Sequence, residues 1–230
     1  MGAFFAPIYK KGEKMKLGAI KLESLYLCFP NPQLYVDTDD DALLSEALSN
    51  LKDDSNYADY LNAMIGAINR CLSVFEIKGV IPKKRVSVPF NPSGVKDGSF
   101  VIRMSSLAPD AKRVDSVITY PKGDLPLHIE FADMGDGEIY VEPISEGGCY
   151  TVRYEPVAER ISQLTPEGYE INLPNRLAEL IPYFVKGDIL RVDDPEEAKD
   201  AYTLFYGLLD EIKEGERLYS NIVRTVYKMD

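Results

Sequence analysis

The period of the hydrophobic pattern changes twice along this chain. Between Glu76 and Glu155 apolar and polar residues alternate, and turn sequences rich in Gly, Pro, Asn and Asp separate the alternating runs. This spacing is typical of half-buried strands. On both sides of that segment apolar residues recur every three or four positions, as they do on one face of a helix. The sequence therefore predicts an α+β protein in which a small antiparallel β-sandwich or barrel domain is inserted into a helical bundle.

The same pattern predicts how the chain is divided. Glycines and prolines punctuate the first 36 residues and leave room for at most a strand around Ala19 to Phe29. We expect an extended N-terminal arm (1–38), the first part of the bundle (39–75), the inserted β domain (76–160), the second part of the bundle (161–215) and a C-terminal tail (216–230).

The second part of the bundle is predicted to hold two helices. Pro182 lies in the middle of the first one and removes a backbone donor, so this helix should kink or break near Pro182. Asp194, Pro195 and two glutamates then form a typical helix start. The apolar face of the second helix is predicted from Ala198, Ala201, Leu204, Phe205, Leu208, Leu209 and Ile212. We expect the first helix to pack between this helix and the earlier bundle through Leu177, Ile181, Phe184, Leu61, Ile65, Ile68, Leu204 and Leu208.

Composition excludes several classes of protein. A formal net charge of -11 argues against a surface that coats nucleic acid, although an acidic body is compatible with lining a DNA conduit. Three widely spaced cysteines predict neither a disulfide framework nor a metal site. No apolar run approaches the length of a membrane helix and no targeting signal is recognised, so we expect synthesis in a cytoplasm and no membrane association.

Motifs that carry chemistry are not found in the sequence. His128 alternates with apolar neighbours on a predicted strand and is expected to be a solvated surface residue. The acidic cluster at 37–41 resembles the start of a calcium loop, but Ala42 and Leu48 stand where glycine and glutamate are needed, so helix capping explains it better. We predict no catalytic, cofactor-binding or metal-binding residue, no cofactor and no enzymatic activity. A hydrolase with paired carboxylates stays open because distances between acids are not visible in a sequence.

Two features favour a role in binding partners. The chain has 15 tyrosines and no tryptophan, a composition that suits extended contact surfaces, although tyrosines at the rim of a core are the more ordinary explanation. The tail carries apolar residues at helical spacing beside basic ones, and this stripe either folds back on the bundle or docks on a partner. The candidate docking residues are Arg217, Leu218, Tyr219, Ile222, Val223, Arg224, Val226 and Tyr227.

One segment of the sequence resembles a known family. The run LPNRLAELIPYFVKGDIL followed by DDPEEAKDAYTLFYGLLDEI is similar to the C-terminal helix pair of tailed-phage head-tail connector proteins, also called portal adaptors or neck ring proteins. DYLNAMIGAINRCLSVF, which leads through IPKKRVSV into strands, resembles the N-terminal half of the same proteins. The resemblance covers roughly residues 39–213. Its motif residues are Leu177, Ile181, Pro182, Phe184, Gly187, Asp188 and Pro195.

This resemblance implies a structural protein of the virion neck. Connector subunits assemble into a cyclic ring, commonly of twelve copies, that joins the portal to the tail or to further neck proteins and lines the DNA exit channel. DNA would then pass without sequence-specific binding, and the C-terminal tail would dock on the portal protein. The alternative is a β-sandwich ligand- or carbohydrate-binding module with helical flanks, which exposed aromatic residues clustered on one sheet face would favour.

Overall fold

The computed structural model describes residues 14–30, 40–120, 126–145 and 147–226, and it describes side chains as far as residue 215. The described residues up to Val74 and from Glu159 onward form one compact unit, which we call the helical unit. Phe75–Ala158 form the second, which we call the β unit. These bounds lie within two residues of the predicted 76 and 160. The protein is thus of mixed α+β class, as predicted.

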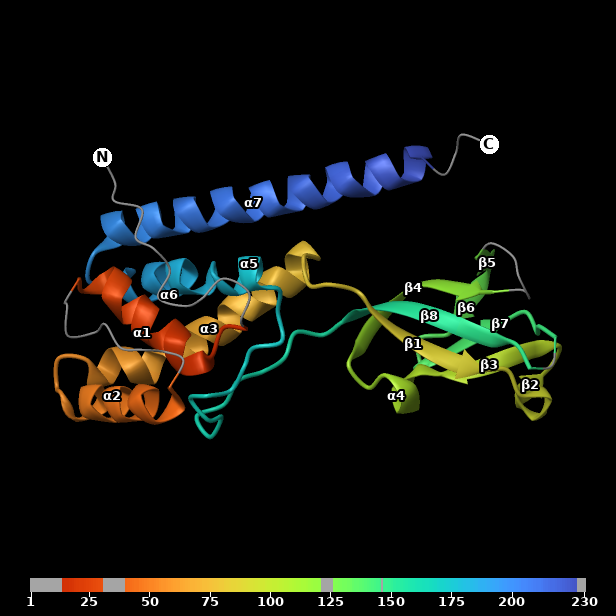
Figure 1. Ribbon diagram of the computed structural model, residues 1–230, viewed down its shortest axis with the longest axis horizontal. Coiled ribbons are helices and arrows are strands. Elements are labelled where there is room, and N and C mark those ends of the chain that lie inside the picture. The colour runs from red at the N-terminus through yellow and green to blue at the C-terminus, as the bar shows by residue number, and fades with distance from the viewer. Residues whose placement is uncertain (1–13, 31–39, 121–125, 146, 227–230) are drawn as a thin grey trace. The chain divides into compact units, whose positions relative to one another are not determined.

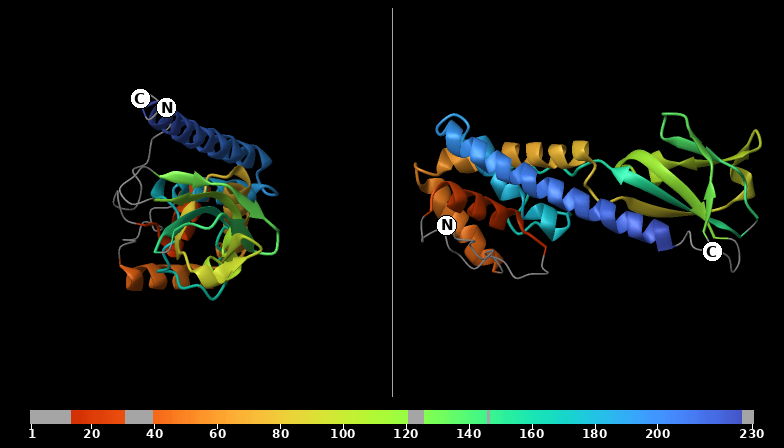
Figure 2. Two further views of the ribbon diagram at one scale, coloured as in Figure 1. Left: turned by 90° about the vertical axis from the view of Figure 1, so that its right-hand side faces the viewer. Right: turned by 90° about the horizontal axis from the view of Figure 1, so that it is seen from above.

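The helical unit is built from two segments of the chain, one before and one after the β unit in the sequence (Figure 1). Helix α1 packs against α2 and α6, and α6 packs against α7. Helix α7 is a single unbroken rod in all three views (Figures 1 and 2). The helices are α1 (Leu17–Cys28), α2 (Asp41–Asp53), α3 (Ala58–Lys78), α5 (Asn175–Ala178), α6 (Ile181–Leu190) and α7 (Pro195–Val226); the last residues of α3 belong to the β unit.

Helix α1 corrects the prediction of an extended arm with a strand near Ala19 to Phe29. Most of its side chains are buried, including Leu17, Ile20 and Leu25 at 0% exposure. A helix that is apolar on nearly all sides lacks the polar face on which the helical pattern depends, so the pattern fails to reveal it. Gly18 is needed for packing, because a Cβ atom there would lie 2.8 Å from the side chain of Leu44 on α2. The other parts of the predicted arm, 1–13 and 31–38, lie outside the described residues.

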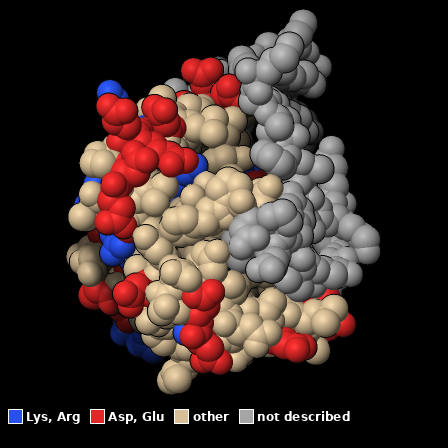
Figure 3. Space-filling model, turned by 90° about the vertical axis from the view of Figure 1, so that its left-hand side faces the viewer, with Lys and Arg blue, Asp and Glu red and all other residues tan. Residues whose placement is uncertain are grey.

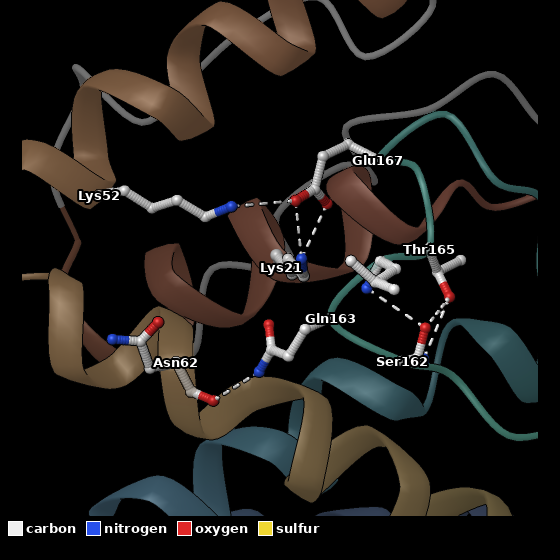
Figure 4. Close-up of polar contacts among 8 residues, drawn as sticks. Lys21, Lys52, Asn62, Ser162, Gln163, Thr165 and Glu167 are labelled. Atoms are coloured by element: carbon white, nitrogen blue, oxygen red, sulfur yellow. Dashed lines mark hydrogen bonds and ion pairs between the residues drawn. The ribbon is translucent and has the colours of Figure 1, made fainter.

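An ion pair fixes the segment that returns from the β unit to α5. The Lys21 ammonium on α1 donates to both carboxylate oxygens of Glu167 at 2.8 and 2.9 Å, and its side chain is only 5% exposed. Lys52 of α2 approaches the same carboxylate at 3.6 Å, and Gln163 donates to the backbone oxygen of Asn62 on α3 (Figure 4). The return segment is therefore held against three helices of its own unit.

The chain passes from the helical unit to the β unit and back again, and hydrogen bonds join these two stretches within each unit. In the helical unit, the Asn69 side chain donates to the carbonyl of Ile161 at 2.8 Å and accepts from its amide at 2.9 Å. In the β unit, the Glu76 carboxylate accepts from the amide of Ala158 at 3.1 Å. The outgoing and returning stretches therefore lie side by side.

The β unit contains two four-stranded antiparallel sheets, with strand orders β1-β8-β4-β5 and β2-β3-β7-β6. Because the sheets are separate, the predicted alternative of a closed barrel is wrong. The first sheet consists of β1 (Lys84–Pro89), β8 (Cys149–Pro156), β4 (Ala111–Thr119) and β5 (Leu127–Ile129). The second consists of β2 (Val95–Lys96), β3 (Ser99–Arg103), β7 (Glu138–Val141) and β6 (Phe131–Asp133), and the short helices η2 (Pro92–Gly94) and α4 (Met104–Leu107) flank β2 and β3.

Side chains from both sheets form the core of the β unit. On β8 the buried residues Tyr150, Val152 and Tyr154 alternate with more exposed ones. The Tyr150 ring stacks on Phe100 with 5.4 Å between centroids, and its hydroxyl donates to the carbonyl of Glu142 at 2.7 Å. The buried phenol thus keeps a hydrogen-bond partner. The core residues are Val88, Phe100, Ile102, Met104, Ala108, Val114, Val117, Ile139, Val141, Tyr150, Val152 and Tyr154.

Candidate functional site

The junction between α6 and α7 is defined by local sequence signals. Helix α5 ends at Ala178 and α6 begins at Ile181 with Pro182 in its first turn, which confirms the predicted break near Pro182. The Asp194 carboxylate accepts from the amide of Glu197 at 3.0 Å. Pro195 is the first residue of α7, and glutamates occupy its first turn. The predicted start of this helix is confirmed.

Helix α7 buries one narrow face. The Phe184 ring on α6 lies 5.1 Å from the ring of Phe205 and 5.4 Å from that of Tyr202. Leu204 is 47% exposed, so its predicted packing in the core is wrong. Leu208 is partly buried. A helix that packs mainly on one neighbour buries only a narrow face, so some of its apolar residues stay exposed. The other predicted packing residues are buried: Leu61, Ile65, Ile68, Leu177, Ile181 and Phe184.

Gly187 and Asp188 join three helices. A Cβ atom on Gly187 would lie 3.1 Å from the Tyr202 ring, so glycine lets α7 approach α6 closely. The Asp188 carboxylate accepts from the Arg70 guanidinium of α3 at 3.1 Å and from the Tyr202 hydroxyl at 3.3 Å. A second guanidinium nitrogen of Arg70 pairs with the other carboxylate oxygen. Asp188 therefore links α3, α6 and α7.

Arg70 and Tyr202 both keep their protons around neutral pH. Burial, followed by the charge and hydrogen bond of Asp188, raises the pKa of Tyr202 to about 12. The hydrogen bond to Asp188 raises the pKa of Arg70 above its already high value. Because both groups keep their protons near neutral pH, the cluster is suited to holding helices together rather than to transferring protons.

A solvent-facing hollow of about 490 Å³ lies beside this cluster. Its surface is mostly apolar, and the rings of Tyr202 and Tyr206 stack along it with 6.5 Å between centroids. The complete lining is Arg191, Pro195, Ala198, Lys199, Tyr202, Thr203 and Tyr206. This hollow was not predicted from the sequence. The available signal was a pair of tyrosines four residues apart on one face of α7.

Acidic side chains surround the start of α7. Figure 3 views this end of the helical unit and shows red acidic groups in greater abundance than blue basic ones. Within 193–200 the exposed acids are Asp193, Asp194, Glu196, Glu197 and Asp200. Lys199 is the basic residue in that range. The apolar hollow is therefore next to a strongly negative surface.

Residues 216–226 of the predicted docking tail are part of α7. The helix continues without a break to Val226, so the boundary predicted at residue 216 does not coincide with a helix end. Seven candidate residues lie on this extension: Arg217, Leu218, Tyr219, Ile222, Val223, Arg224 and Val226. Their side chains, and Tyr227 entirely, lie outside the described residues.

The remaining candidate residues are dispersed. His128 is exposed on β5, as predicted, and Asp40 caps α2 by accepting from the amides of Ala42 and Leu43 at 2.8 and 3.2 Å. The three cysteines are free thiols. Among the described residues, no group of three or more His, Cys, Asp or Glu side chains has a geometry suited to a metal ion. Tyr120 is the one exposed aromatic residue in the described part of the β unit.

Comparison of the sequence with models of protein families and with curated proteins returns no match. Within the described ranges, no helix is both long and apolar enough to cross a membrane.

Proposed function

We propose that this chain is a subunit of the head-tail connector ring of a tailed phage. In this proposal about twelve copies assemble as a ring between the portal protein and the tail or further neck proteins. The ring lines the channel through which DNA leaves the capsid and has no enzymatic turnover. DNA passes without sequence-specific contacts, and the site of action is the neck of the virion.

The observation that carries this proposal is the length of α7. Leu209 is its last fully buried side chain among those described, yet the helix continues to Val226. At 1.5 Å per residue this extension is about 25 Å long. Its sequence carries the apolar residues Leu218, Ile222, Val223 and Val226 at helical spacing, with Arg217 and Arg224 beside them. A long extension with an apolar stripe and basic neighbours suits docking in a partner's groove.

The motif that resembles connector proteins also supports the proposal. Leu177, Ile181 and Phe184 are buried in the helical unit, and Gly187 and Asp188 fix α6 against α7 and α3. These residues hold the first half of α7 in place. The extension would then start from a fixed base.

Native mass spectrometry tests the proposal directly. The purified chain should be measured alone and mixed with the portal protein of the same phage. We expect a complex that contains about twelve copies, or about 310 kDa from chains of 25.8 kDa, at least when the portal is present. An unrelated portal serves as the control. A chain that stays at 25.8 kDa with its own portal would contradict the proposal.

A further inference from the structure

The hollow on α7 has the properties of a docking site for an apolar segment. It is mostly apolar, it is lined by two stacked tyrosine rings, and Tyr206 is 39% exposed. Arg191 and Lys199 are among its lining residues. Aromatic rings with polar edges are well suited to burying other aromatic side chains.

The surface beside the hollow indicates the charge of the occupant. Residues 193–200 carry five acids and one lysine. Glu197 already pairs with Lys186 at 2.6 Å, and Asp194 caps α7. Glu196 and Asp200 are exposed and form no ion pair with another described residue. A suitable occupant therefore combines aromatic residues with positive charge that can approach these two carboxylates.

One segment of this chain has that composition. Residues 3–9 read AFFAPIY and are followed by Lys10 and Lys11. They lie outside the described residues, and the chain enters the described part at Lys14, just before α1 of the same unit. Phe4 lies ten residues before Lys14, and ten extended residues reach about 35 Å. Helix α1 begins shortly after Lys14 and is about 18 Å long, and Cys28 at its end packs with Ala198, which lines the hollow. The segment is therefore long enough to reach the hollow.

We propose that residues 3–11 dock into the hollow of their own chain. Phe4 and Phe5 lie against Tyr202 and Tyr206, and the two lysines approach Glu196 and Asp200. Covalent attachment makes the docking intramolecular, with an effective concentration of order millimolar, so modest contacts are sufficient. This inference does not depend on the proposed connector function.

Tryptophan fluorescence provides the test, because the chain contains no tryptophan. Phe4→Trp and Phe5→Trp each place a single reporter in the segment. We expect acrylamide to quench the docked reporter about threefold less than in urea, because the ring is partly buried. Adding Thr203→Arg or Tyr206→Ala should raise the quenching constant to the value of a solvated tryptophan. Tyr120→Ala, at an exposed tyrosine of the β unit, is the matched control and should leave quenching unchanged.

A charge-reversal variant tests the ionic part. Glu196→Lys combined with Asp200→Lys should increase quenching, and added salt should do the same in the parent. Glu46→Lys, on the exposed face of α2, is the control. Quenching that does not change in the Thr203→Arg and Tyr206→Ala variants overturns the proposal. Quenching that depends on protein concentration overturns it as well, because the segment would then occupy a second copy.

Discussion

Two adjacent residues, Gly187 and Asp188, owe their identity to partners far away in the sequence. Gly187 is constrained by the ring of Tyr202, and Asp188 by Arg70, which lies 118 positions earlier. The resemblance to connector proteins marked both residues, but it did not reveal these contacts. Local patterns contain no information on which helix will approach a given turn, so such pairs become visible only in the folded structure.

A substitution of Phe184 tests the packing of the helical unit most directly. It is 5% exposed and contacts the rings of Tyr202 and Phe205. Phe184→Ala should lower the free energy of unfolding by about 3 to 5 kcal/mol, because it leaves a cavity. Urea denaturation measures the change. Leu204→Ala, at a 47% exposed position on α7, is the control and should change stability little. Equal effects of the two variants would show that this packing is wrongly assigned.

Glu23 introduces a pH dependence that the sequence did not suggest. One carboxylate oxygen of this α1 residue is buried without a hydrogen-bond partner among the described residues. Burial, assisted by the charge of Glu179, raises the pKa of Glu23 from 4.5 to about 7. Between these two values the folded state holds a proton that the unfolded state has released. Stability is therefore greatest below pH 4.5 as far as this group is concerned and falls as pH rises through about 7.

Glu23→Gln should remove this dependence, because a glutamine does not ionise. The free energy of unfolding of the variant minus that of the parent should be larger at pH 8 than at pH 4.5. The increase should be at most about 3 kcal/mol, an upper bound set by the size of the pKa shift. Thermal or urea unfolding at a series of pH values measures the difference. Glu46→Gln on the exposed face of α2 is the control. Parallel pH profiles for the parent and Glu23→Gln would refute the assignment.

At the scale of helices and strands, prediction succeeded where an element has one buried and one exposed face. The strands β1, β3, β4, β7 and β8 lie in the segment where alternation predicted strands, because their side chains alternate between core and surface. Helix α7 starts at the predicted cap. Helix α1 was missed because it is buried nearly all round and carries Gly18. The hollow beside Tyr202 and Tyr206 depends on where α6 meets α7, and no local pattern contains that information.

The extension of α7 can be removed without touching a described core contact. Deleting residues 217–230 should change the melting temperature of the helical unit little, because the last fully buried side chain described on α7 is Leu209. Attachment to the portal should be lost, because the deletion takes away the apolar stripe and its basic neighbours. Calorimetry and co-sedimentation measure the two effects. Arg217→Glu with Arg224→Glu keeps the helix length and should weaken attachment in a salt-dependent way. A truncated protein that unfolds, or that still binds the portal fully, would contradict the docking role.

At the scale of the whole molecule, the chain consists of two units with separate cores. The β unit is inserted between Val74 and Glu159, and hydrogen bonds from Asn69 and Glu76 hold its two ends side by side. Units with close ends and their own core are commonly able to fold alone. The period change in the sequence predicted this division, because each unit has its own type of secondary structure.

Replacing residues 75–158 by a short Gly/Ser linker should leave the helical unit folded, because the Asn69 contacts to Ile161 lie outside the excised segment. The excised β unit should also show one cooperative transition. Circular dichroism and calorimetry of both proteins measure these outcomes. Asn69→Ala in the shortened chain is a useful comparison and should destabilise it by about 1 to 3 kcal/mol, since buried backbone groups lose their partner. Failure of the linker protein to fold would mean that the helical unit depends on the β unit.

The paired crossings also bear on the order of folding. The two parts of the helical unit are separated by the entire insertion, and bringing them together from an open chain costs loop-closure entropy that grows with the logarithm of loop length. Once the β unit has folded, its ends already lie beside each other at Glu76 and Ala158. The two parts of the helical unit are then separated by a short effective loop instead of the whole unfolded insertion. An early β unit should therefore speed the meeting of α3 with α6 and α7, and the insertion acts as a template for folding.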